Sequence, residues 1–289
     1  MASLEEFQTH RRRLWAVAYR LTGSVADADD AVQEAWLRWQ RLPDDVADDP
    51  GSYLTTVVSR ICLDLFTSAR ARRETYAGPW LPEPVVTDEP GPEEQAALDE
   101  SVGMALLFVL ERLTPAERTA LVLHDVFSVP FQEIAEVVDR SPESVRQLAS
   151  RARKRVRAEA PRQTVDRGEH RRTVEAFLAA VVGGELADLM EVLDPEVVWR
   201  SDGGGKITAA RLPVVGREKV ARYVANVVRT FAPDSMQMLL REVNGAPGAV
   251  FLTGDGEPLG ALAFTVHDGR ITDVAAVVNP DKLSHLQGR

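Results

Sequence analysis

A proline-rich acidic stretch between residues 76 and 100 places the strongest constraint on how this chain folds. It contains no lysine or arginine, and its acidic residues are Glu83, Asp88, Glu89, Glu93, Glu94, Asp99 and Glu100. Its prolines are Pro79, Pro82, Pro84, Pro90 and Pro92. Proline lacks the amide hydrogen that helices and sheets use, and like charges repel one another. The stretch therefore predicts an extended linker between separately folded parts.

The spacing of apolar residues differs along the chain. Helical spacing dominates before the linker and returns after it, whereas strand-like alternation begins near residue 168. The chain has 289 residues, which is longer than one average domain. We expect a helical domain over 1–75, a linker over 76–97, a second helical domain over 98–160, a short linker over 161–168 and an α+β domain over 169–289.

The first domain carries local signals for three helices. Ser3 and Glu6 have the spacing of a capping box, and Gly23 suits the end of the helix that they would begin. Apolar residues then recur at three- and four-residue intervals over 28–39, which indicates an amphipathic helix. A third helix is expected from about residue 50 to the basic run that ends at residue 73.

The second domain contains two short helices joined by a tight turn. The run Thr-Pro-Ala-Glu at 114–117 predicts a helix start, and two further helices are expected over 130–139 and 141–158. Positive charges outnumber negative ones over 140–162. The arrangement is typical of a helix-turn-helix that binds a polyanion, although a solvated charged face on an ordinary helical hairpin is the alternative.

The third domain mixes both kinds of spacing. Helices are expected over 169–182 and 217–231. Strands are expected over 196–201, 236–243, 249–253, 259–267 and 271–278. Asp268-Gly269 predicts the turn of a β-hairpin.

Composition narrows the class of protein. The formal net charge is −10, which argues against a nucleic-acid partner until the local reversal of charge is considered. The single cysteine, Cys62, excludes an internal disulfide and a cysteine-rich zinc site, and we expect it to be a buried core thiol. No apolar run is long enough to span a bilayer, and the first residues are acidic rather than basic. These features favour a cytoplasmic protein.

Several strings, taken in order, resemble those of one family. They are the run 27–36 (DADDAVQEAW), the run 113–118 (LTPAER) followed by the helix pair, and the strings 80–84 (WLPEP), 202–206 (DGGGK) and 279–283 (NPDKL). The sequence is similar to bacterial RNA polymerase sigma factors of the extracytoplasmic-function (ECF) class. It resembles in particular the subgroup that carries a C-terminal domain of the SnoaL or NTF2-like kind.

The resemblance implies a multidomain fold and a set of partners. Two all-α sigma domains, a helical region 2 and a helix-turn-helix region 4, would precede an α+β NTF2-like cone. The partners would be core RNA polymerase, through the clamp of its largest subunit and its flap, and promoter DNA. No cofactor, metal or membrane partner is implied. The polymerase-binding residues would be Asp27, Asp30, Gln33, Glu34, Trp36 and Arg38.

Promoter contacts are implied in two places. The third helix would hold the opened minus-ten strand through Arg60, Phe66, Arg70, Arg72 and Arg73, with Tyr53 as another stacking candidate. The helix-turn-helix would contact the minus-thirty-five duplex through Ser144, Arg146, Gln147, Ser150, Arg151, Arg153, Lys154 and Arg157. Arginine can pair with guanine through two hydrogen bonds, and lysine supplies a point charge to phosphate.

The C-terminal domain would regulate the sigma domains through contacts from three strings. The residues are Trp80, Leu81, Pro82, Asp202, Gly203, Gly204, Gly205, Lys206, Asn279, Pro280, Asp281, Lys282 and Leu283. A phosphate-binding loop at 202–206 is rejected because the spacing of its glycines and lysine does not match.

Two other functions stay open at this point. An enzyme would need an ionisable pair in the cone, for which Trp199, Asp202, Tyr223 and His267 are the available residues, but His267 is expected in a surface turn. A helix-turn-helix regulator that senses an unidentified small ligand in the cone is the alternative to a sigma factor.

Overall fold

The computed structural model describes residues 3–42, 49–74, 76–87, 103–159, 166–231 and 235–286, without the side chains of 67–74. It divides into two compact units. The N-terminal unit comprises Met1–Thr75 and Val109–Glu159, and the C-terminal unit comprises Tyr76–Phe108 and Ala160–Arg289. Each unit is described separately.

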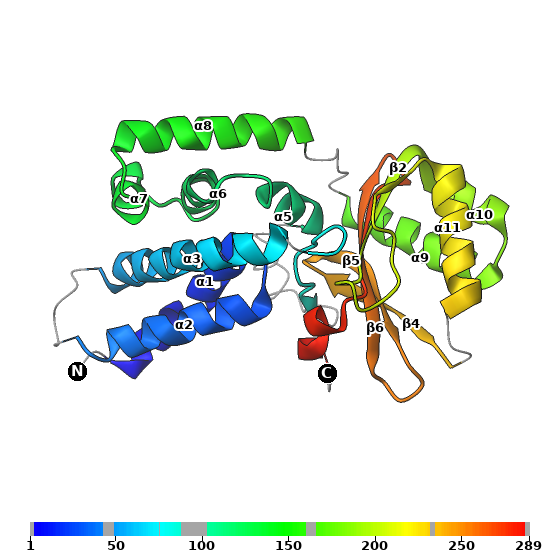
Figure 1. Cartoon of the computed structure of the whole chain (residues 1–289), viewed down its shortest axis with the longest axis horizontal. Helices are drawn as coiled ribbons and strands as arrows, with labels where there is room; N and C mark the ends of the chain where they lie inside the picture. Colours follow the sequence, from blue (N-terminus) through cyan, green and yellow to red (C-terminus); the bar gives the residue numbers. More distant parts are fainter. Residues whose placement is uncertain are drawn as a thin grey trace. The chain divides into compact units, whose positions relative to one another are not determined.

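The described part of the N-terminal unit is helical (Figure 1). Its helices are α1 (Leu4–Thr22), α2 (Val25–Trp39), α3 (Pro50–Glu74), the end of α5 (Met104–Leu110), α6 (Pro115–Leu121), α7 (Phe131–Val138) and α8 (Pro142–Glu159). A π-helical turn, Val122–Val126, follows α6 directly. The helix pair expected over 130–139 and 141–158 is confirmed.

Local capping explains most of these boundaries. Gly23 ends α1 in the left-handed conformation, with φ of 69°. Thr114 and Glu117 form the predicted capping box at the start of α6, with Pro115 as the first helical residue. The expected capping box at Ser3 is wrong, because the Ser3 side chain makes no capping hydrogen bond. The first residues of the helical domain expected over 98–160 lie outside the described residues.

A buried arginine ties α6 to the end of α1. Arg118 is 1% exposed, and its Nε donates to the Leu110 carbonyl oxygen at 2.9 Å. Its other donors reach the Leu21 carbonyl oxygen at 2.6 Å and the Glu111 carboxylate at 2.5 Å. A buried charge is tolerated only when it is paired and hydrogen-bonded, as this guanidinium is. The packing of the N-terminal unit therefore depends on Arg118.

The C-terminal unit is built on a seven-stranded sheet in the order β1-β4-β5-β6-β7-β2-β3. The strands are β1 (Val86–Thr87), β2 (Leu193–Asp202), β3 (Val214–Val215), β4 (Gln237–Val243), β5 (Ala246–Leu252), β6 (Pro258–His267) and β7 (Arg270–Val277). The helices are α9 (Arg167–Gly183), α10 (Leu186–Val192) and α11 (Arg217–Phe231), followed by the 3₁₀ turns η2 (Pro280–Lys282) and η3 (Ser284–Leu286). β2 and β7 are parallel, and the other neighbours are antiparallel.

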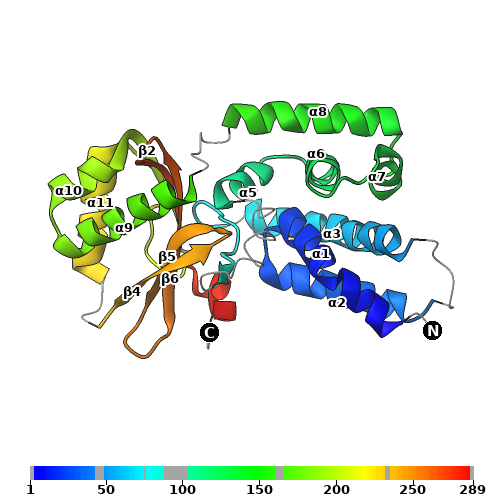
Figure 2. The same ribbon diagram turned by 180° about the vertical axis from the view of Figure 1, so that it is seen from behind.

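Each face of the sheet has its own core. Alternate side chains such as Trp199 and Phe264 pack with α9, α10 and α11 on one face. On the opposite face, Val277 packs with Leu81 of the linker and with Leu283 near the C-terminus. Figures 1 and 2 show the helices on one side of the sheet and the linker and the terminal turns on the other.

The strands agree with the alternation in the sequence, and the Asp268-Gly269 hairpin is confirmed, because both residues have positive φ between β6 and β7. Three short elements are not anticipated by the sequence, namely α10, β3 and β1. β1 belongs to the acidic linker, which joins the sheet as an edge strand beside β4.

Composition led to two further expectations, namely that no apolar run spans a bilayer and that Cys62 is a buried core thiol. Among the helices that the structure describes, none is both long and apolar enough to cross a membrane. Cys62 is fully buried in α3, and burial raises the pKa of its thiol to about 12. The expectation of a buried core thiol is confirmed.

A buried histidine makes the stability of the C-terminal unit depend on pH. His170 is 3% exposed, and burial, with the nearby positive charge of Arg167, lowers its pKa from 6.5 to about 4. The stabilising contribution of neutral His170 is complete above pH 6.5 and is lost as the pH falls toward 4. We expect a loss of up to about 3 kcal/mol in unfolding free energy over this range. Urea unfolding of the wild type and His170→Gln at several pH values measures it, and identical pH profiles would contradict the prediction.

Candidate nucleic-acid interface and linker clasp

One face of α8 presents a stripe of exposed polar and basic side chains. Val145, Leu148, Ala149 and Ala152 are buried against the rest of the unit. The opposite side carries the residues that we call the α8 stripe: Arg146, Gln147, Ser150, Lys154 and Arg157, all exposed. Residues three or four positions apart share a helix face, so these side chains can contact one surface together. Ser144 is half-buried beside the helix start.

The other arginines of α8 are engaged by acidic side chains. Arg153 donates two hydrogen bonds to Asp125, at 2.7 and 2.6 Å. Arg151 donates to Glu117 at 3.3 Å, and Arg155 lies 3.7 Å from the same carboxylate. Burial alone would raise the pKa of Glu117, but hydrogen bonds from Thr114 and Arg151 hold it below its usual range. Glu117 therefore stays charged and able to hold both arginines.

The residues expected to bind polymerase lie on α2. Asp30, Gln33 and Arg38 are exposed, and Arg38 pairs with Glu34 at 2.8 Å. Asp27 and Trp36 are half-buried, and Trp36 packs on Phe7 with ring centroids 5.0 Å apart. Exposed Leu37 adds an apolar group to the same helix.

The residues expected to bind the minus-ten strand are engaged within the N-terminal unit. Arg60 donates to the Glu136 carbonyl oxygen of α7 at 2.9 Å. Phe66 is 7% exposed, and the Arg118 guanidinium lies 5.1 Å from its ring centroid. Tyr53 packs against Trp39. The side chains of Arg70, Arg72 and Arg73 lie outside the described residues.

In the C-terminal unit, the three strings meet around one carboxylate. Asp202 is the last residue of β2 and is fully buried. Its Oδ1 accepts from the Tyr76 hydroxyl at 2.5 Å and from the Gly204 amide at 3.1 Å. Its Oδ2 accepts from the Leu81 amide at 2.8 Å and from the Lys282 ammonium at 2.8 Å. A buried carboxylate needs this many partners, so the site holds its surroundings in one arrangement.

Lys282 supplies the opposite charge from near the C-terminus. It is 5% exposed and also donates to the Leu81 carbonyl oxygen. Its ammonium nitrogen lies 3.8 Å from the centroid of the Trp80 ring, within the range of a cation–π interaction. Tyr76, Trp80, Leu81, Asp202, Asn279 and Lys282 together form what we call the linker clasp.

Asn279 and the glycines complete the clasp. The Asn279 amide donates to the Tyr76 hydroxyl at 2.8 Å and its oxygen caps η2. Gly204 has φ of +61°, and a Cβ there would lie 2.3 Å from the Asn279 side chain. A Cβ at Gly203 would lie 2.4 Å from the Ile207 carbonyl oxygen. Glycine is needed at these positions because the backbone passes against Asn279 and folds tightly on itself.

The remaining predicted regulatory residues surround the clasp. Pro82 and Leu283 are buried, and Gly205 has positive φ in the same turn as Gly204. Lys206 pairs with Asp281, beside Pro280, at 2.7 Å, but both side chains are more than half exposed. This exposed pair is a natural control for the buried Asp202–Lys282 pair.

Sequence reasoning missed three residues that hold the linker to the sheet. Tyr76 marks only the start of the linker in the sequence, yet burial and its bond to Asp202 raise the pKa of its hydroxyl. Asn244 exchanges two hydrogen bonds with Val85, and His285 lies 2.8 Å from the Pro84 carbonyl oxygen. Asn244 begins an Asn-Gly pair, which is a local signal for a hairpin turn, whereas no local signal marks Tyr76 or His285.

The residues considered for catalysis do not form one site. Trp199 donates to Ser201 at 2.7 Å, and Tyr223 lies 3.2 Å from the same hydroxyl. Asp202 belongs to the clasp on the opposite face of β2, and His267 lies beside the hairpin turn as expected. No acid–base pair joins Asp202 or His267 to Tyr223 among the described side chains.

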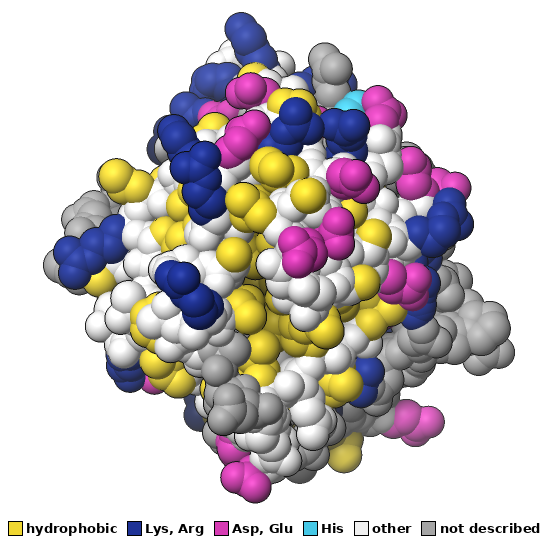
Figure 3. Space-filling model, turned by 90° about the vertical axis from the view of Figure 1, so that its right-hand side faces the viewer, with side chains coloured by type: hydrophobic (Ala, Val, Ile, Leu, Met, Phe, Trp, Pro, Cys, Tyr) yellow, Lys and Arg dark blue, Asp and Glu magenta, His cyan; other side chains and the backbone are white. Residues whose placement is uncertain are grey.

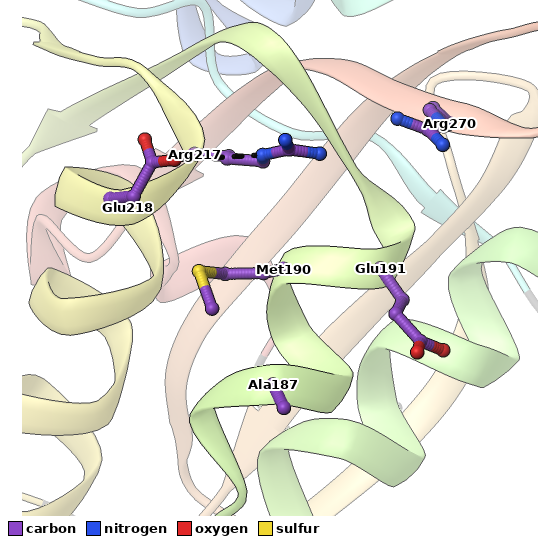
Figure 4. A pocket seen from close by; sticks show the side chains of 6 residues that line it. All are labelled: Ala187, Met190, Glu191, Arg217, Glu218 and Arg270. Carbon is purple, nitrogen blue, oxygen red and sulfur yellow. Dashed lines mark ion pairs between the residues drawn. The ribbon is translucent and has the colours of Figure 1, made fainter.

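The surface of the C-terminal unit has an open hollow of about 600 Å³. Figure 4 shows its lining, in which Arg217 extends across the hollow and pairs with Glu218 at 3.7 Å, while Arg270 lies on the other side. Figure 3 shows hydrophobic surface gathered across the middle of the face that it presents, with charged side chains around it. The exposed large apolar residues described in this unit are Val182, Ile207, Leu212, Val215 and Phe231.

Comparison with known proteins identifies three matched segments. Residues 7–72 match Sigma-70 region 2, residues 103–156 match Sigma-70 region 4, and residues 174–274 match the SnoaL-like domain. The chain is 45% identical to the ECF RNA polymerase sigma factor SigJ of Mycobacterium tuberculosis, over 97% of this chain and 93% of that protein. It is 34% identical to the probable ECF RNA polymerase sigma factor SigI of the same organism, over 97% and 94%.

A solved structure agrees with these matches. The crystal structure of Mycobacterium tuberculosis SigJ superposes with a TM-score of 0.77, at 41% identity and over 98% of both chains. The chain therefore belongs to the family of ECF RNA polymerase sigma factors. Its C-terminal unit carries a SnoaL-like α+β domain, as the sequence predicted.

The structure of the clasp predicts that replacing Asp202 by asparagine lowers the unfolding free energy far more than replacing Asp281 does. Asp202→Asn removes the counter-charge of buried Lys282, so we expect a loss of about 3–5 kcal/mol in the unfolding free energy of the C-terminal unit. Asp281→Asn breaks only the exposed pair with Lys206 and should cost at most about 1 kcal/mol. Urea unfolding followed by tryptophan fluorescence measures both, and equal losses would contradict the assignment of Asp202 as the buried anchor.

Proposed function

We propose that this chain binds core RNA polymerase and directs promoter-specific initiation of transcription, and that its C-terminal unit modulates this activity. The similarity to ECF sigma factors along nearly the whole chain carries the proposal. As the family's name states, its members are sigma factors, and we propose no catalytic activity for this chain. Core polymerase and promoter DNA as partners place its action in the cytoplasm.

The N-terminal unit supplies the binding surfaces in this proposal. The exposed side of α2, with Asp30, Gln33 and Arg38, contacts the clamp of the largest polymerase subunit. Exposed polar groups beside a partly buried tryptophan suit a protein interface. The flap of the polymerase contacts region 4. Region 2 corresponds to the domain over 1–75, and region 4 to the domain over 98–160.

Promoter recognition is divided between the two regions. The α8 stripe enters the major groove of the minus-thirty-five duplex, where Arg146 and Gln147 can reach base edges and Lys154 and Arg157 can reach phosphates. Arg60, Phe66 and the basic end of α3 hold the opened minus-ten strand. Because Arg60 and Phe66 are engaged with α7 and α6 in the free chain, they must be released before they contact DNA.

The linker clasp limits the separation of the two regions. The linker follows region 2 in the sequence and precedes region 4. Its length therefore sets the largest distance that can separate the two regions. An extended chain spans at most about 3.5 Å per residue, so residues 76–87 could span about 40 Å if they were free. Held on the sheet, they span only the fixed distance between their ends. We infer that the clasp restrains promoter engagement and that its release increases transcription.

Run-off transcription tests the proposal. Core polymerase with the full chain, on DNA upstream of the chain's own gene, should give transcripts that core polymerase alone does not give. Asp202→Asn should increase the transcript several-fold by releasing the linker, whereas Asp281→Asn should match the wild type.

Two results would contradict parts of this account. Binding of duplex DNA with no transcript from any form of the chain would favour the ligand-sensing regulator instead of a sigma factor. Transcription by the wild type with an equal or lower yield from Asp202→Asn, in a protein that circular dichroism shows to be folded, would overturn the restraining role of the clasp.

A further inference from the structure

The basic residues of α8 fall into two sets that differ in their partners. The α8 stripe is exposed, and within it Arg146 lies 3.6 Å from Glu143 of the same helix and has its guanidinium 5.6 Å from the centroid of the Phe131 ring. Arg151, Arg153 and Arg155 instead pair with carboxylates outside α8 and lie at the two borders between the stripe and the buried face, where Arg151 and Arg155 are exposed and Arg153 is half-buried. A helix turns about 100° per residue, so 151 and 155 share one border and 153 lies on the other.

Each border is held by an acidic side chain from the segment packed beneath α8. Glu117 comes from the first turn of α6 and faces Arg151 and Arg155. Asp125 comes from the π-helical turn that continues α6 and accepts both hydrogen bonds of Arg153. The two acids are therefore on one continuous helical segment, and they hold α8 from both sides.

The geometry of the Asp125–Arg153 pair is specific. Two parallel hydrogen bonds of 2.7 and 2.6 Å fix the guanidinium in the plane of the carboxylate. Only about a third of either side chain is exposed. A phosphate would have to displace Asp125 to reach the Nε and Nη2 donors of Arg153. Lys154, the next residue, needs no such exchange because its side chain already lies in the exposed stripe.

We propose that Asp125 and Glu117 are positioning residues for DNA recognition, and that Arg151, Arg153 and Arg155 fix the rotation of α8 instead of contacting the duplex. The acids determine which side of α8 faces the groove, so that Arg146, Gln147, Ser150, Lys154 and Arg157 make the contacts. This inference rests on the proposed function, because it assigns roles within the same DNA-binding surface.

Reversal of one ion pair tests it directly. Arg153→Asp and Asp125→Arg each place like charges together, and each should weaken promoter binding by the holoenzyme about tenfold. The double variant Asp125→Arg with Arg153→Asp restores the pair with opposite polarity, so it should bind within about threefold of the wild type. If Arg153 contacts phosphate, the double variant stays at least as weak as Arg153→Asp, because an aspartate would then face the DNA.

The salt dependence of promoter binding is a second measurement. The slope of log affinity against log salt reports how many phosphates the protein contacts, so loss of a residue that contacts no phosphate leaves it unchanged. Lys154→Ala should lower the slope of log affinity against log salt by about one, since it removes a phosphate contact. Arg153→Ala should weaken binding without changing that slope. A slope lowered by Arg153→Ala would overturn the positioning role.

These experiments distinguish a wrong role for Arg153 from the absence of DNA binding by the chain. Should the reversed pair not fold, as judged by thermal melting, the alanine cycle of Asp125→Ala, Arg153→Ala and both together replaces it. If the loss of promoter affinity in the double variant differs from the sum of the two single losses, the positioning pair is supported. If the three losses are additive, the positioning role is overturned. If the wild-type holoenzyme binds no promoter, or Lys154→Ala has no effect, the DNA-binding function itself fails.

Discussion

The C-terminal half of this protein is organised around one buried carboxylate. Asp202 gathers a hydroxyl, two backbone amides and an ammonium group, and these donors come from the linker, from its own turn and from the C-terminus. Because a charge without water needs all of these partners, the segments that supply them are fixed together. The apolar contacts of Leu81 and Leu283 with the sheet then cover a face that would otherwise be exposed.

The N-terminal unit uses charge in a different way. Arg118 is buried and joins the end of α1 to α6, so one guanidinium contributes to the packing of both sigma regions. On α8, three arginines are directed to acids beneath the helix, and this leaves a narrower set of side chains for DNA. The same residue type thus serves the core, the orientation of a helix and the binding surface.

The sequence predicted those features that depend on local signals. The capping box at Thr114, the turn at Asp268-Gly269 and the helix pair all follow from residues close together in the chain. Ser3 lacked its capping bond, and the contacts of Tyr76, Asn244 and His285 could not be foreseen, because their partners lie more than a hundred residues away. Asp125 lies 28 residues from Arg153, so a basic run alone could not show which arginines are already paired.

Amide hydrogen exchange of the free full-length chain tests the clasp most directly. The account predicts that the Leu81 amide, which donates to buried Asp202, exchanges as slowly as amides in the middle of β2. Asp202→Asn should accelerate it, while Asp281→Asn should leave it unchanged. Exchange of the Leu81 amide in the wild type at the rate of an unstructured chain would contradict the central claim that the linker is held on the C-terminal unit.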